Sequence, residues 1–265
     1  MAAVKDFYGY MDQIAPFAFQ EDFDNAGFLV GRGDRPVEKA LVALDIAEAV
    51  VSEAADWGAQ LIVAHHPVIF QPARSVTDES LVGRVLLALA ENKIAAICAH
   101  TNLDAAQDGV NDCLARALEL TDVGQLHQAG VDAQGRPYGI GRTGTAHRPG
   151  LSAAEYAAFV KEKLGSACVR FVDGGRPVEK VAVGGGACGS MMEDALARGC
   201  DTFVTADLKY NNFLDARVQG LNLLDAGHFP TENVVCQPLV CRLSEAFPEV
   251  EVRLSKVHRE IYSAI

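Results

Sequence analysis

The amino-acid sequence predicts an α/β fold built from two α/β lobes. Short apolar runs rich in β-branched residues alternate with amphipathic stretches, which is the order of strands and crossover helices in such a fold. The chain has 265 residues, enough for one large domain or two small ones. The alternation fails once, in a glycine-rich stretch at 125–150, and then resumes. We therefore expect two lobes, with a boundary near residue 125.

The first half of the chain shows the alternation most clearly. Gly58 stands where a helix C-cap is expected, between an amphipathic stretch and the next apolar run. The pattern predicts strands at 39–46, 60–64 and 94–99, and helices at 48–57, 79–92 and 109–118.

The second half opens with Ser152 and Glu155, whose hydroxyl and carboxylate can cap a helix reciprocally. We expect this helix to end at residue 164, and Pro238 to offset a later one. The remaining predicted elements are strands near 168–172, 181–184, 201–205, 221–225 and 250–254, and a helix around 234–247. We assign 1–124 with 229–265 to the first lobe and 125–228 to the second, without an inserted domain.

Composition excludes several classes of protein. Hydrophobic residues make up 49% of the chain and charged residues 22%, which excludes a disordered or fibrous protein. The net charge of −12 argues against nucleic-acid binding, because the chain would repel a phosphate backbone. The start lacks a basic segment followed by an apolar run, and no apolar stretch reaches 18 residues, so we expect a cytoplasmic protein that does not enter membranes. Seven cysteines without C-x-x-C spacing predict buried free thiols.

Histidines and carboxylates follow three of the predicted strands directly. The ligand crevice of a parallel sheet lies at the carboxyl ends of its strands, so residues at these positions are the first candidates for a site. Four of the seven histidines lie there, within the segments 65–67 (HHP), 100–104 (HTNLD) and 228–232 (HFPTE).

Histidine nitrogen and carboxylate oxygen are ligands for Zn, Fe, Mn or Ni, and paired cysteines for a structural thiolate site are absent from the sequence. His228 and Glu232 are four residues apart, so they share a helix face if Pro230 takes the first or second helical position. Adjacent residues on a strand point in opposite directions. His65 and His66 can therefore serve one pocket only beyond the strand end, and two neighbouring metal ions would give each histidine its own ion.

These segments also carry a family resemblance. HHPVIF, HTNLD followed by GVND, DNAGFLVG near the start and GHFPTE near the end together resemble the dinuclear-metal proteins called GTP cyclohydrolase 1 type 2 homologues, or NIF-three-like proteins. The matching blocks extend from Asp24 to Glu232 in the family's order. The resemblance implies two α/β lobes with the metals in the cleft between them, and a toroidal homohexamer.

Residue by residue, the resemblance places two divalent metal ions on His65, His66, Asp104, His228 and Glu232, with Glu232 bridging the ions. The length fits the short form of the family, without its extra domain. One departure stands at 205–211 (TADLKYN), where the family commonly ends the motif in histidine and this chain has Asn211. This difference leaves substrate handling at that position open.

Three further residues have both a functional and a structural interpretation. His100, four residues before Asp104, is our catalytic candidate as a proton donor or as a partner of a metal ligand, and a buried structural histidine is the alternative. Asp24, before Asn25, could hydrogen-bond into the cleft, although we prefer a structural turn. Asp45 could support a metal ligand, although we prefer a helix cap.

A glycine-rich loop at 184–189 follows a predicted strand and could hold a phosphate through its amides, or could let helix and strand pack closely. It lacks the lysine and hydroxyl residue of a P-loop. His127, His147 and His258 lie in loop-like or tail contexts, where we expect exposed or structural roles.

The preferred function is a metal-dependent hydrolase of a nucleotide or related phosphorylated small molecule. Two divalent ions carry four positive charges, of which Asp104 and Glu232 offset two, and the remainder favours a small anionic substrate. The alternative from another class is a noncatalytic protein that stores, delivers or senses metal, or acts as a scaffold. A third hypothesis is a nucleotide-binding module that uses the glycine loop without metal.

Overall fold

The structure, a computed structural model, describes residues 1–264. Its contacts divide the chain into two compact units. Unit 1 contains Met1–Leu103 and Cys236–Arg259, and unit 2 contains Asp104–Val235 and the described residues from 260 onward. The first division falls after Leu103, whereas the sequence placed a boundary near residue 125. The segment between these positions contains α5 (Val110–Ala117), which packs against β8 and α9 of unit 2.

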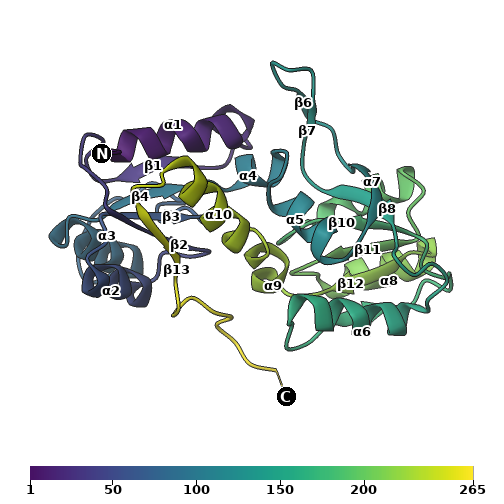
Figure 1. The fold of residues 1–265 in the computed structure, drawn as a ribbon. Helices are drawn as coiled ribbons and strands as arrows, with labels where there is room; N and C mark the ends of the chain where they lie inside the picture. Colours follow the sequence, from purple (N-terminus) through teal and green to yellow (C-terminus); the bar gives the residue numbers. More distant parts are fainter. Residues whose placement is uncertain (265) are drawn as a thin grey trace. The chain divides into compact units, whose positions relative to one another are not determined.

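Unit 1 contains a five-stranded sheet in the order β1-β4-β3-β2-β13 (Figure 1). Its neighbours pair in parallel, except that β1 is antiparallel to β4. Helices α2 and α3 pack their apolar side chains on one face of this sheet. The elements are β1 (Gly27–Val30), β2 (Lys39–Ala43), β3 (Leu61–Ala64), β4 (Ala95–Cys98), β13 (Glu251–Leu254), α1 (Val4–Ile14), α2 (Glu48–Trp57), α3 (Leu81–Glu91) and α10 (Cys236–Ala246), with a short 3-10 helix at Phe17–Phe19.

Unit 2 contains a six-stranded sheet in the order β5-β8-β10-β11-β12-β9. The three strands β10, β11 and β12 are parallel, and the outer pairings are antiparallel. The elements are β5 (Thr121–Gln125), β8 (Arg142–Thr145), β9 (Arg170–Val172), β10 (Lys180–Val183), β11 (Thr202–Thr205), β12 (Asn222–Asp225), the hairpin β6 (Gly130–Val131) and β7 (Pro137–Tyr138), α6 (Ala153–Leu164), α7 (Met192–Ala197), α8 (Tyr210–Gln219), α9 (His228–Asn233) and a 3-10 helix at Gly189–Met191. Helix α4 (Thr101–Ala105) contains the division between the units.

The predicted α/β class is confirmed, and many element positions agree with the sequence analysis. Helix α2 has the predicted bounds and ends at Gly58, whose φ of 78° is left-handed and suits glycine. At α6, the Ser152 Oγ accepts from the Glu155 amide and the Glu155 carboxylate accepts from the Ser152 amide, as predicted. Pro238 lies in the first turn of α10, where a missing N–H removes no helical hydrogen bond.

Arg142 is the largest fully buried side chain of the described residues. Its guanidinium donates to both carboxylate oxygens of Asp112, at 2.6 and 3.1 Å, and to the carbonyl oxygens of Ala106, Gly139 and Gly141 at 2.8 to 3.0 Å. This buried ion pair ties β8 to α5 and to the loop before β8. It is a structural pair, because every one of these donors is used inside the unit.

The cysteines divide into buried and exposed thiols. Cys98, Cys113, Cys200 and Cys236 are buried as predicted, Cys188 is half-buried, and Cys168 and Cys241 are exposed. Burial raises the pKa of Cys98 to about 12 and that of Cys200 to about 11, so these two thiols stay protonated at neutral pH. Among residues 1–264 the structure contains no helix with the length and apolar character needed to span a bilayer.

Candidate metal-binding site

Three histidines meet in unit 1 at the carboxyl ends of two neighbouring parallel strands. His65 and His66 follow β3, and His100 lies between β4 and α4. One ring nitrogen from each lies within 4.8 Å of the others, and the ring centroids are 5.0 to 5.6 Å apart. Because His65 and His66 lie beyond the last residue of β3, the alternation of the strand does not separate them. The structure therefore brings together the unit 1 histidines that the sequence singled out.

His65 and His66 are each held through Nδ1. The Nδ1 of His65 donates to the carbonyl oxygen of Ala99 at 2.8 Å, and the Nδ1 of His66 lies 2.7 Å from Oδ1 of Asp45. A carbonyl oxygen can only accept, so the proton of neutral His65 is on Nδ1 and the lone pair is on Nε2. A metal-ligating histidine is typically oriented in this way by an oxygen atom on its other ring nitrogen.

The preferred interpretation of Asp45 as a helix cap is wrong. Ala47 is the N-cap of α2, and no side chain among the described residues caps this helix end. Asp45 instead contacts His66, which was the alternative interpretation.

Asp24 anchors His100 from a distant part of the chain. Its side chain is fully buried and accepts from Nδ1 of His100 at 2.8 Å, from the amide and hydroxyl of Thr101, and from the amide of Asn25. Burial alone would raise the pKa of Asp24, but the hydrogen bonds from His100 and Thr101 lower it to about 2. The preferred interpretation of Asp24 as only a turn residue is therefore incomplete, because its carboxylate positions His100.

Unit 2 contributes His228 and Glu232 from one face of α9. Gly227 is the N-cap, so Pro230 takes the third helical position rather than the first or second as expected. The Nε2 of His228 lies 3.1 Å from Oε2 of Glu232, which confirms that the two side chains share a face. The Nδ1 of His228 contacts a carboxylate oxygen of Asp207 at 2.7 Å, the same arrangement as for His66.

Asp104 lies close to Glu232 within unit 2. It is buried on α4, and one of its carboxylate oxygens lies within 4.8 Å of one from Glu232. The Nδ2 of Asn111 donates to the Asp104 carbonyl at 3.0 Å and fixes the backbone there. Burial, together with the negative charges of Asp104 and Glu232, raises the pKa of the nearby Cys188 thiol far above its usual range. Three oxygen and nitrogen donors are thus gathered in unit 2.

The glycine-rich loop supports Glu232 by leaving room for it. A Cβ at Gly186 would lie 2.1 Å from Oε1 of Glu232 and 3.2 Å from Nε2 of His228, so any larger residue would force the Glu232 carboxylate to shift. The φ of Gly186 is also left-handed, at 64°. This cradle and the donor set on α9 fit a bound cation. Of the two roles considered for the glycine-rich loop, close packing is the one that the structure supports at Gly186.

The alternative role of the loop, phosphate binding, does not fit its hydrogen bonds. The amides of Gly184, Gly185 and Gly186 donate to Val204, Asn111 and Thr231 at 2.9 to 3.0 Å. These amides would have to give up bonds inside the protein before they could contact a phosphate.

The remaining predicted sites lie apart from these clusters. His127 and His147 are half exposed, and the Nδ1 of His258 accepts from the Leu44 amide at 3.2 Å, so their exposed or structural roles agree with the prediction. Asn211 is exposed at the start of α8, and the consequence of its difference from histidine stays a prediction.

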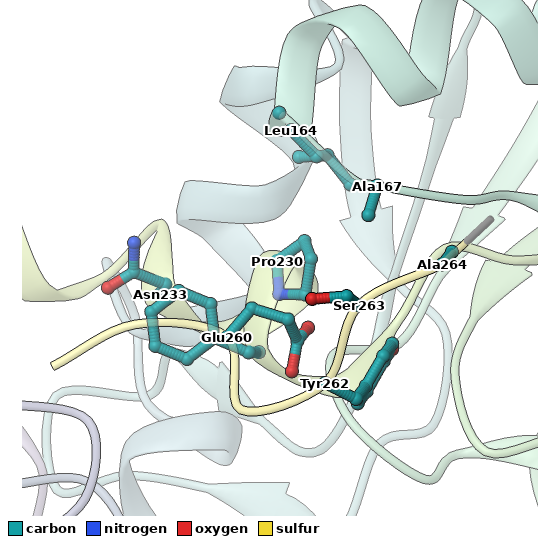
Figure 2. Close-up of a pocket in the computed structure, with 10 residues that line it drawn as sticks. Leu164, Ala167, Pro230, Asn233, Glu260, Tyr262, Ser263 and Ala264 are labelled. Carbon is teal, nitrogen blue, oxygen red and sulfur yellow. The ribbon is translucent and has the colours of Figure 1, made fainter.

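A pocket of about 510 Å³ lies next to α9 in unit 2 (Figure 2). Phe229, Pro230 and Asn233 line it, together with three residues of 164–167 and four of the tail segment 260–264. His228 and Glu232 do not contribute to its lining, so this pocket is separate from the candidate ligands.

Sequence reasoning did not select Asp207, and it preferred other roles for Asp24 and Asp45. Asp207 belongs to the quoted 205–211 motif and has a left-handed φ of 55°, which is uncommon outside glycine. A carboxylate two residues past a predicted strand was the available signal for it.

Comparisons with known proteins agree with this fold. The chain matches the Duf34/NIF3 (NGG1p interacting factor 3) family over residues 2–261. It is 37% identical to a GTP cyclohydrolase 1 type 2 homolog of Streptomyces coelicolor over 89% of this chain and 83% of the relative. A homolog of the same name from Clostridium perfringens is 32% identical over 99% of both chains. A solved Staphylococcus aureus hypothetical protein superposes with a TM-score of 0.92 at 28% identity, covering 99% of both chains. The chain therefore belongs to the Duf34/NIF3 family.

Proposed function

We propose that this protein binds two divalent metal ions through His65, His66, Asp104, His228 and Glu232, and that it is a metal-dependent hydrolase. The observation that carries the proposal is the way His65, His66 and His228 are held through Nδ1. Each of them has Nδ1 against an oxygen atom, from Ala99, Asp45 or Asp207, at 2.7 to 2.8 Å. This arrangement fixes the ring and directs the lone pair to Nε2, as metal ligands require.

The donor set indicates which ions fit. Three imidazoles and two carboxylates suit Zn, Fe, Mn or Ni, and the mixture of nitrogen and oxygen donors is typical of open, catalytic sites. When bound, two such ions supply Lewis acidity and lower the pKa of water toward about 7. Asp45 and Asp207 hold the imidazoles in place, and Gly186 keeps the Glu232 carboxylate at the position it occupies beside His228.

The proposed substrate is a nucleotide or a related phosphorylated small molecule. The relatives named GTP cyclohydrolase 1 type 2 homolog support a nucleotide. Two divalent ions on two carboxylates leave a net positive charge, which attracts an anion despite the chain's overall charge of −12. We further propose a homohexamer, in line with the resemblance found in the sequence.

The first test is elemental analysis of metal per chain on protein purified without chelator or His-tag. We expect about two ions per chain, and a loss in His65→Ala and Asp104→Ala. His147→Ala and Asp215→Ala are matched controls, because both side chains lie on the exposed surface away from the ligands. Failure of the parent protein to bind metal even after reloading would refute the metal site.

The second test separates a hydrolase from a metal store. The metal-loaded protein is screened against nucleotides and phosphoesters, alongside Glu232→Gln. We expect turnover in the parent and loss of both turnover and metal in the variant. Dose-dependent metal exchange without turnover of any substrate would contradict the hydrolase and support storage or delivery.

A further inference from the structure

The pocket of about 510 Å³ beside α9 has the size of a small-molecule site (Figure 2). All of its lining residues belong to unit 2. Its apolar part comes from two helices, with Leu164 as the last residue of α6 and with Phe229 and Pro230 on α9. The described tail supplies the polar groups, Glu260, Tyr262 and Ser263. The pocket therefore combines an apolar wall with a few polar side chains, as ligand sites do.

The tail that forms one side of this pocket is held against the start of α9. The hydroxyl oxygen of Tyr262 lies 3.1 Å from the position that a Cβ would take at Gly227, which is the N-cap of α9. Glu260 is half-buried, although it belongs to a segment without helix or strand. The polar groups of the tail are thus placed beside the apolar residues of α9.

The charge of the pocket is negative. Glu260 is the charged side chain of the lining, and none of the lining residues is lysine, arginine or histidine. Burial raises the pKa of the Tyr262 hydroxyl, and so do the negative charges of three carboxylates, Glu260, Asp225 and Asp207. Helix α6 also ends here, and its terminal carbonyl groups carry partial negative charge. A phosphorylated molecule would be repelled, whereas a cation would be attracted.

Asn233 adds an oxygen atom that the chain leaves without a donor. It lines the pocket, and within residues 1–264 its buried Oδ1 accepts no hydrogen bond. Buried oxygens without a donor are uncommon in folded proteins and indicate places where a donor from outside the chain is missing. A ligand that brings N–H groups would suit this lining better than one that brings only acceptors.

We infer that this pocket binds a small organic cation, a primary amine carried on an apolar body, with the ammonium group at Glu260 and the body against Phe229 and Pro230. The inference does not depend on the proposed metal function. His228 and Glu232 lie on α9 but outside the lining, and the preferred charge is opposite to that of the proposed anionic substrate. The site is therefore a second one, separate from the substrate's.

The test is a fluorine NMR titration of the full chain with para-fluorobenzylamine and para-fluorobenzoate. The two probes share a ring and differ in the sign of their charge. Each is measured on protein as purified and after chelation, because an amine can also coordinate a metal ion. We expect saturable binding of the amine alone, with the same affinity in both preparations.

Two variants with matched controls locate the probe. Ala167→Trp places an indole at an exposed lining position and should abolish saturable binding, whereas Ala129→Trp, exposed in unit 2 outside the pocket, should not. Glu260→Gln should lower the affinity for the amine by about 5- to 10-fold, because a half-buried charge partner is lost. Glu162→Gln removes an equal charge from an exposed position outside the lining and should leave the affinity unchanged.

Four outcomes overturn the inference, and none of them bears on the metal ligands. The first is the absence of saturable amine binding, and the second is binding of the benzoate as tightly as the amine. The third is undiminished amine binding in Ala167→Trp, which would place the probe elsewhere. The fourth is loss of amine binding after chelation, which would place the amine on a metal ion and would itself support the proposed metal function.

Discussion

Replacing Gly186 with alanine tests whether the glycine loop is shaped around Glu232. The new Cβ would lie 2.1 Å from Oε1 of Glu232, whereas real Cβ atoms do not come closer than 3.0 Å to such neighbours. The carboxylate oxygen therefore has to move by about 0.9 Å, well beyond the roughly 0.2 Å that metal–ligand distances tolerate. We expect Gly186→Ala to weaken metal binding by about 10- to 100-fold, as loss of a supporting contact does at other metal sites.

The control separates this clash from backbone strain. Gly199 has a similar left-handed φ of 72°, but no described atom lies within 4 Å of the position its Cβ would take. Gly199→Ala therefore carries the same strain of about 1–2 kcal/mol without displacing a ligand. Both variants should lose thermal stability to a similar extent, and only Gly186→Ala should lose metal affinity.

The assay is a competition titration with a chromophoric chelator on metal-free protein, with thermal unfolding measured in parallel. Equal metal affinity in Gly186→Ala and the parent protein would refute the reasoning, since it would mean that Glu232 is not held against the loop. Equal losses of affinity in both glycine variants would attribute the effect to strain rather than to the carboxylate.

Three other predictions concern the partners of buried groups. Asp207→Asn should reduce metal affinity by about 10-fold, because the carboxylate that orients Nδ1 of His228 loses its charge, and the same titration measures it. Arg142→Met should lower the free energy of unfolding by about 3–5 kcal/mol, because Asp112 keeps a buried charge without its partner; denaturant unfolding of the variant checks this. The pKa of His258 is lowered from 6.5, mainly because burial disfavours the charged ring, although Asp45 and Glu53 act in the opposite direction. The unfolded chain then binds the proton more tightly, so the contribution of His258 to stability is complete above pH 6.5 and is lost as pH falls through 6.5 toward the lower folded value. In His258→Asn the side-chain oxygen still accepts from the Leu44 amide, so melting temperatures of this variant should depend less on pH between 5 and 7.

The sequence predicted the candidate ligands better than it predicted the residues that hold those ligands in place. His65, His66 and His100 were found because β3 and β4 are parallel, and the residues after parallel strands meet at one edge of the sheet. His228 and Glu232 were found because four residues make slightly more than one helical turn. Both arguments depend on local periodicity, which a sequence displays directly.

The supporting residues could not be found in this way. Asp24 precedes His100 by 76 residues and Asp207 precedes His228 by 21, so each contact exists only once the strands and loops have folded. A cap is a local interaction, so the sequence favours the nearby helix start for Asp45, but its partner in the structure is His66, just beyond the end of β3. The predicted lobe boundary near residue 125 rested on composition, whereas the units in the structure divide inside α4.

The two exposed cysteines offer a use of a different kind. Cys168 lies in unit 2 and Cys241 in unit 1, while the buried Cys98 and Cys200 have raised pKa values that keep them poorly nucleophilic. A thiol-reactive probe should therefore attach first at one position in each unit, without any engineered cysteine. A pair of spin labels or dyes at these two cysteines then reports the distance between the two labelled positions as metal is added or withdrawn.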